Sequence, residues 1–161
     1  SALTTFTARL IALGSAHDQL MRRNWQSTDL ASLTVAVMTP LGLEGRVKVN
    51  GPFLCLGPDT ATSFSMVLHE LATNALKHGA LSVPDGIVSL NWTIEGYGPE
   101  SAMMLTWQET DGPSVTVPNR TGFGIRLLQA GLGHQGKTEL HYDPEGLRVE
   151  MTASIISMAS H

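Results

Sequence analysis

The stretch HELATNALKH, residues 69–78, holds side chains whose types and spacing could do chemistry. At about 100° per residue of a helix, Glu70, Asn74 and Lys77 fall within an arc of roughly 60°. A carboxylate, an amide and an ammonium in line can hold a hard cation with its waters and contact phosphate oxygens, because Mg²⁺ prefers oxygen ligands. The alternative is a solvated helix edge on which Glu70 and Lys77 form an ion pair.

The two histidines of this stretch do not form a zinc-protease motif. That motif needs a second histidine four residues after His69, and Thr73 stands there. His69 projects about 100° away from Glu70, which favours a packing or supporting role for its ring. His78 ends the predicted helix, where an imidazolium is favourable, so it is predicted either as a helix cap or as a cofactor-binding residue.

Two glycine-bearing segments, 107–113 and 121–124, follow downstream. Glu109 ends a predicted strand just before the turn at Gly112, and a buried acid at such a place can accept the exocyclic amino hydrogens of a purine. Glycines let a backbone approach a ligand closely, and free amides at a helix start attract phosphate. Neither a GxxxxGK[ST] nor a GxGxxG motif is present, so a different nucleotide-binding fold is required. The residues that open the second segment are Thr121, Gly122 and Gly124.

The elements that must position these residues follow from periodicity. Residues 60–78 have the length and period of a helix, which Gly79 ends. Residues 86–96 and 101–110 alternate as strands, and residues 136–155 indicate a hairpin with its turn at 143–146. The order predicts a mixed α/β domain.

Earlier in the chain, a cluster ending at Asp29 can cap a short helix that Pro40 and Gly42 terminate. Two short strands are then predicted around a turn at Asn50-Gly51. Residues 3–20 place apolar side chains at alternating steps of three and four, the seam of a helix that packs against another helix or on its own domain.

Composition bounds the class of protein. A chain of 161 residues with 42% hydrophobic residues has the size of one domain with a real core. No stretch approaches the roughly 18 apolar residues of a membrane-spanning helix, and a net charge of −4 disfavours a nucleic-acid partner. The single Cys55 fits a reducing compartment, so we expect a cytoplasmic location.

Three ordered segments resemble a known family. HELATNALKH resembles the N box, WQETDGP the first glycine box and TGFG the second glycine box of the ATP-binding domain of sensor histidine kinases. His69, Trp107 and Glu109 resemble the signature of the HWE subfamily. Asp111 departs from it, because members often carry Gly there, and the lid between the glycine boxes is short. The resemblance implies a Bergerat-type α/β sandwich, with one face of a mixed sheet covered by helices.

The resemblance also implies a role for each matching residue. Asn74 would ligate Mg²⁺, Glu70 would polarise the nucleophile or its water, and Lys77 would contact the phosphates of ATP. Glu109 would contact adenine. The residues that would seat the rest of the nucleotide are His78, Gly112, Thr121, Gly122 and Gly124.

Residues 1–26 are similar to the C-terminal helix of the dimerisation and phosphotransfer hairpin, and 27–161 to the catalytic domain. His17 lies in the apolar seam of that helix, so we expect it to be structural and the acceptor histidine to lie on a hairpin helix outside this sequence. The implied partners are that hairpin, of the same or a partner chain, and a response-regulator receiver domain; the intact protein could be a homodimer. The alternatives are a non-catalytic receiver-binding relative and an ATPase or serine kinase of the same superfamily.

Overall fold

The computed structural model of the chain describes residues 28–113, 136–155 and 158. Within these residues five strands form one mixed sheet, in which β2 pairs with β4 in parallel and the other neighbours are antiparallel. The strands lie in the order β2 (Val47–Asn50), β4 (Ile87–Glu95), β5 (Ala102–Thr110), β7 (Gly146–Ser154) and β6 (Gly136–Asp143).

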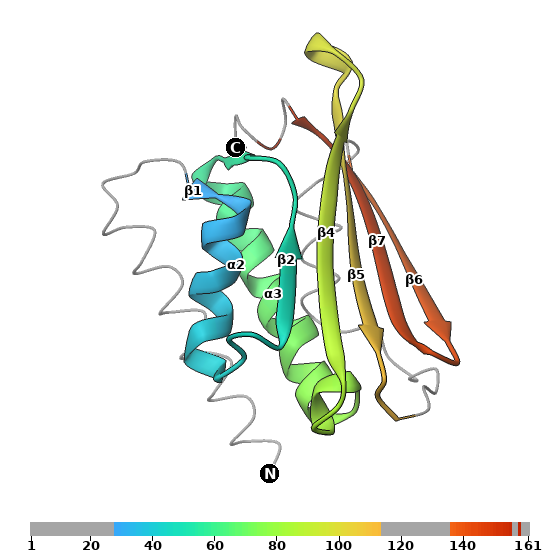
Figure 1. Ribbon diagram of the computed structural model, residues 1–161. Coiled ribbons are helices and arrows are strands. Elements are labelled where there is room, and N and C mark those ends of the chain that lie inside the picture. The colour runs from blue at the N-terminus through green and yellow to red at the C-terminus, as the bar shows by residue number, and fades with distance from the viewer. Residues whose placement is uncertain (1–27, 114–135, 156–157, 159–161) are drawn as a thin grey trace.

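Two helices, α2 (Leu30–Met38) and α3 (Pro58–Lys77), lie side by side on one face of this sheet (Figure 1). The prediction of a mixed sheet with helices on one face is therefore confirmed. None of the helices in the described ranges is long and apolar enough to cross a membrane. The leading helix expected over 1–26 lies outside the described residues.

The core fills the space between α3 and the sheet. The apolar face of α3 is buried, and alternate residues of β4, β5 and β7 meet it, because successive side chains of a strand point to opposite faces. Each large apolar side chain removed from water contributes about 1.5–3 kcal/mol. The largest fully buried side chains of these elements are Phe64, Leu68, Leu71, Leu90, Met103, Leu105, Trp107 and Met151.

The start and end of α2 confirm the prediction from its flanking residues. Asp29 is the N-cap, and its carboxylate accepts a hydrogen bond of 3.0 Å from the backbone amide of Ser32. A 3-10 turn with Pro40 follows the helix, and Gly42 closes it in the left-handed region at φ 71°. Thr28 and Asp29 also form the short strand β1 (Thr28–Asp29), which pairs with β3 (Cys55–Leu56).

The prediction that a turn at Asn50-Gly51 joins two strands that pair with each other was wrong. The two strands exist, but β2 pairs in parallel with β4 and β3 pairs with β1. Neither Asn50 nor Gly51 has a positive φ, which a two-residue hairpin turn of the Asn-Gly type would require. Gly51 lies instead against the indole of Trp92, whose ring occupies the space of a Cβ. The glycine is therefore explained by close packing.

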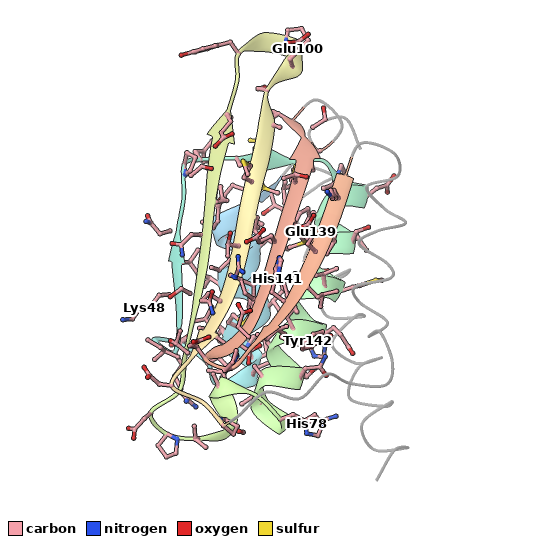
Figure 2. The ribbon with its side chains drawn as sticks, turned by 90° about the vertical axis from the view of Figure 1, so that its right-hand side faces the viewer. Lys48, His78, Glu100, Glu139, His141 and Tyr142 are labelled. Atoms are coloured by element: carbon pink, nitrogen blue, oxygen red, sulfur yellow. The ribbon has the colours of Figure 1, made fainter. Side chains whose placement is uncertain are left out.

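The two later strand pairs form as predicted. β4 and β5 are antiparallel over nine residue pairs, and β6 and β7 join through a turn closed by Asp143 and Gly146. Because buried and exposed residues alternate along β4 and β5, the sheet has a second, more polar face opposite α2 and α3. Figure 2 shows the molecule from the side of this face. The sequence also favours a helix over residues 123–133, which lie outside the described residues.

Candidate functional site

The polar edge of α3 changes from buried to exposed along the helix. Glu70 is buried, Asn74 is half-buried and Lys77 is exposed. Because a helix rises 1.5 Å per residue, Glu70 and Lys77 lie about 10 Å apart along the axis. This edge therefore places a carboxylate inside, an amide at the boundary and an ammonium toward solvent, so an anion would be attracted by Lys77 and would need a cation between it and Glu70.

The two histidines occupy different environments. His69 is only 8% exposed, in keeping with the packing or supporting role predicted for it. His78 is the C-cap residue of α3, as its position predicted, and its backbone amide donates a hydrogen bond of 2.8 Å to the carbonyl of Asn74. Its side chain is exposed at the end of the helix (Figure 2).

Glu109 joins the end of β5 to the turn that follows α3. One carboxylate oxygen accepts a hydrogen bond of 3.0 Å from the backbone amide of Ala80, the first residue of the 3-10 turn η2 (Ala80–Ser82). The other accepts one of 3.1 Å from the indole nitrogen of the fully buried Trp107. These bonds bring the two sequence segments that held most of the predicted site residues into contact.

Burial gives this carboxylate unusual electrostatics. Glu109 is 3% exposed, and this desolvation raises its pKa, while the bonds from Ala80 and Trp107 act in the opposite direction. A carboxylate offers about four acceptor positions, of which these donors use two. Glu109 could therefore accept a further hydrogen bond from a donor such as a purine amino group.

Glycines on both sides allow this close approach. A Cβ at Gly79 would overlap the carboxylate oxygen Oε1 of Glu109, and one at Gly112 would overlap the backbone of Ala80. Gly112 therefore has a packing reason to be glycine, independent of any bound molecule. The glycine predicted for cofactor binding thus lies at the same junction as Glu109.

Arg46 is a supporting residue that the sequence reasoning missed. From the turn before β2 its guanidinium donates three hydrogen bonds to backbone carbonyls of the loop after α3: to Leu81 at 3.2 Å, to Val83 at 2.6 Å and to Gly86 at 2.8 Å. The fixed fork of a guanidinium suits several acceptors at once. Arg46 thereby positions the loop that begins at Ala80.

Asp111 has a backbone conformation that glycine adopts more readily than aspartate does. Its φ is 59°, the left-handed region that glycine adopts readily and other residues adopt at a cost. Aspartate tolerates this region better than most residues do. The backbone at this position therefore suits glycine and is one that aspartate can adopt.

The remaining predicted positions lie outside the described residues. They are Thr121, Gly122 and Gly124 of the second glycine segment, the lid before them and His17 of the leading segment.

The fold and the joined segments define a class of protein. The chain is similar to the blue-light-activated histidine kinase of Erythrobacter litoralis EL346, with a TM-score of 0.67 and 19% identity, over 100% of this chain and 52% of that one. It is also similar to the catalytic domain of the histidine kinase ThkA, with a TM-score of 0.54 and 13% identity, over 80% of this chain and 95% of that one. The fold is that of histidine kinase catalytic domains.

Sequence similarity identifies the family. Residues 1–53 match the family model described as HWE histidine kinase. A blue-light-activated histidine kinase of Brucella anthropi is 36% identical over 152 residues, which make up 92% of this chain and 31% of that protein. The chain belongs to the HWE histidine kinase family and corresponds to a catalytic domain within it. It spans about a third of the length of the curated relatives that it matches.

Proposed function

We propose that this domain binds Mg-ATP and transfers the γ-phosphoryl group to a histidine on a helical hairpin. The observation that carries the proposal is the hydrogen bond from the Ala80 amide to Glu109, which joins the turn that follows the N-box helix to the first glycine box. Membership of the HWE family supports phosphoryl transfer as the reaction. The contact between Ala80 and Glu109 supports a nucleotide site at this end of the sheet.

In this proposal the purine lies at the junction and the phosphates lie along the edge of α3. Glu109 accepts a hydrogen bond from the amino group of adenine in a position that water cannot easily reach, and Gly112 lines the same end. Lys77 and His78, both exposed at the end of α3, contact phosphate oxygens. The resemblance to the second glycine box assigns Thr121, Gly122 and Gly124 to phosphate binding as well.

The donor set also fits a magnesium ion. Asn74 offers an amide oxygen at the boundary between the buried and exposed parts of the helix edge, and oxygen ligands are the ones that Mg²⁺ prefers. When bound, the ion would neutralise part of the phosphate charge. Asn74 is half-buried and so remains in contact with solvent, which would supply the waters that a magnesium ion keeps.

Phosphoryl transfer depends mainly on position and charge, because the transferred group passes through a loose transition state. Lys77 balances negative charge on the phosphates, and Glu70 polarises the attacking imidazole or the water that contacts it. Holding the γ-phosphate in line with an imidazole nitrogen, roughly 3–3.5 Å away, replaces an encounter in solution by a fixed geometry.

The partners belong to the same proposal. In this proposal residues 1–26 would belong to the C-terminal part of the hairpin and residues 27–161 to the catalytic domain, and the acceptor would not be among this chain's six histidines. The phosphohistidine would then serve a response-regulator receiver domain. The hairpin is of the same or a partner chain, which would allow a homodimer. A cytoplasmic location would follow from the use of ATP.

A phosphotransfer assay tests this function. The chain alone, incubated with Mg²⁺ and γ-labelled ATP, should acquire no acid-labile, base-stable label, and a purified hairpin that carries the acceptor histidine should become labelled when added. The Asn74→Ala chain should leave the hairpin unlabelled. Strong label on the isolated chain that disappears in His17→Ala would contradict the assignment of the acceptor, and an unlabelled hairpin would contradict the kinase activity.

A further inference from the structure

Three side chains that can ligate a metal lie together on the polar face of the sheet, away from the site proposed for ATP. Glu139 and His141 come from β6 and Glu150 from β7. Glu139 and Glu150 are directly opposite in the antiparallel register, and His141 is two residues further along the same face. Figure 2 shows Glu139 and His141 on this face of the sheet.

The ligand atoms face one another. The Nε2 atom of His141 lies 3.6 Å from one oxygen of Glu139 and 3.7 Å from one oxygen of Glu150, and all three atoms lie within 4.8 Å of one another. These distances allow an ion pair if the imidazole is protonated, but they are longer than a hydrogen bond. Nε2 is covered from solvent and makes no hydrogen bond to the part of the chain that the structure describes.

Two neighbouring cations, Lys137 and Arg148, pair with carboxylate oxygens other than the ones near His141. The ammonium of Lys137 lies 2.9 Å from Oε1 of Glu139, and the guanidinium of Arg148 pairs with Oε1 of Glu150. In both glutamates the other oxygen, Oε2, is the one near His141. Two glutamates directly opposite on a sheet repel each other unless positive charge lies near them. Lys137 and Arg148 supply that charge at the two Oε1 atoms, and a cation between the two Oε2 atoms would give Nε2 of His141 a partner.

The type of ligand selects the ion. One imidazole nitrogen with two carboxylate oxygens suits a divalent first-row transition ion such as Zn²⁺, whereas Mg²⁺ and Ca²⁺ prefer oxygen ligands alone. Ligands at 2.0–2.2 Å in a tetrahedron stand about 3.3–3.6 Å apart. The distances of 3.6 Å and 3.7 Å from Nε2 to the two glutamate oxygens are close to this range. Glu139 and Glu150 are 45% and 39% exposed, so small rotations of their side chains can close the remaining gap.

We propose that Glu139, His141 and Glu150 form a surface site for a divalent transition ion, with Zn²⁺ as the probe and water in the fourth position. The ion would link β6 to β7 across the edge of the sheet. The site rests on the geometry of these two strands alone and is independent of the proposed kinase function.

Titration calorimetry of the 161-residue chain with zinc chloride tests the site, in buffer that contains excess Mg²⁺ and neither nucleotide nor phosphate. We expect a site of one zinc per chain whose affinity falls at least about tenfold in His141→Ala and in Glu139→Gln. Saturating zinc should raise the Tm of the wild type by roughly 5 °C and leave that of His141→Ala unchanged.

Glu95→Gln is the matched control, because it removes an exposed glutamate from β4 of the same sheet. It should bind zinc like the wild type. Far-UV circular dichroism confirms that each variant is folded, and Glu150→Gln replaces any variant that is not. No zinc binding, or equal zinc affinity in the wild type and in His141→Ala, would overturn the proposal.

Discussion

The carboxylate of Glu109 accepts a hydrogen bond of 3.0 Å from the backbone amide of Ala80, twenty-nine residues earlier in the chain. The bond ties the 3-10 turn that follows α3 to the end of the central strand β5. Because Glu109 is buried, the loss of this acceptor would leave an amide without a partner in a place that water does not easily reach. The bond therefore holds the fold together at the point where the nucleotide is proposed to bind.

Glu109→Gln should reduce the free energy of unfolding by about 1–3 kcal/mol. A carboxylate accepts from both Ala80 and Trp107, whereas a glutamine would turn its amide nitrogen toward one of these two N–H donors. Urea unfolding measures the difference. Glu95→Gln, at an exposed position, should change stability by less than about 0.5 kcal/mol, and an equal loss in both variants would contradict the role of this junction.

The wild type and Glu109→Gln should also differ in how their free energy of unfolding changes with pH. The pKa of Glu109 is raised above its ordinary value of 4.5, chiefly by desolvation, so the native state keeps this proton at pH values where the unfolded chain has lost it. The stability that Glu109 contributes through this proton is present below pH 4.5 and is lost as the pH rises through the raised pKa. The stability of the wild type relative to Glu109→Gln should therefore fall over that range, and a rise would contradict the shift.

The strands of both later hairpins could be predicted because their alternation of buried and exposed residues is local in sequence. The partners of β2 could not, since a parallel pair joins residues about forty positions apart and leaves no local signal. Asn50-Gly51 was misleading because a glycine that makes room for Trp92 looks in sequence like a turn glycine.

In the candidate site, too, only residues with a local sequence signal could be predicted. The polar edge of α3 follows from helix period alone, and Glu109 was found because it ends a strand before a glycine turn. Arg46 escaped notice because its three acceptors are backbone carbonyls 35–40 residues later, and carbonyls have no signature in a sequence. Side chains that support a loop through its backbone are visible only in three dimensions.

Arg46→Ala should destabilise the domain by about 2–4 kcal/mol, since three carbonyls lose a charged donor. It should also speed hydrogen exchange at the Ala80 amide, because the loop that begins there loses its anchor. Lys48→Ala, which removes an exposed cation two residues away, is the control and should alter neither quantity. Unchanged exchange at Ala80 in Arg46→Ala would show that the loop is held by other contacts.

Asp111→Gly should stabilise the domain by about 0.5–1 kcal/mol, because glycine adopts a φ of 59° without the steric cost of a Cβ. Asp111→Ala keeps the Cβ and should give no such gain. Thermal unfolding of the three proteins measures the comparison. A loss of stability in Asp111→Gly would mean that the aspartate side chain contributes more than its backbone conformation costs.

The base preference tests the role given to Glu109. A buried acceptor built for an amino group rejects a base that presents a carbonyl oxygen there, since two acceptors would then face each other. ATP should therefore compete better than GTP for the domain, and the wild type should show a larger preference than Glu109→Ala. Equal affinities of the wild type for the two nucleotides would remove the assignment of Glu109 to adenine.

The central claim is that the edge of α3 binds the metal and phosphates of ATP, and titration calorimetry with a non-hydrolysable ATP analogue tests it most directly. The wild type should bind one nucleotide per chain, and Asn74→Ala should weaken that binding more in the presence of Mg²⁺ than in its absence, because only the metal-dependent part of the affinity passes through the amide oxygen. An absence of binding at millimolar nucleotide, or an equal loss with and without Mg²⁺, would contradict the account.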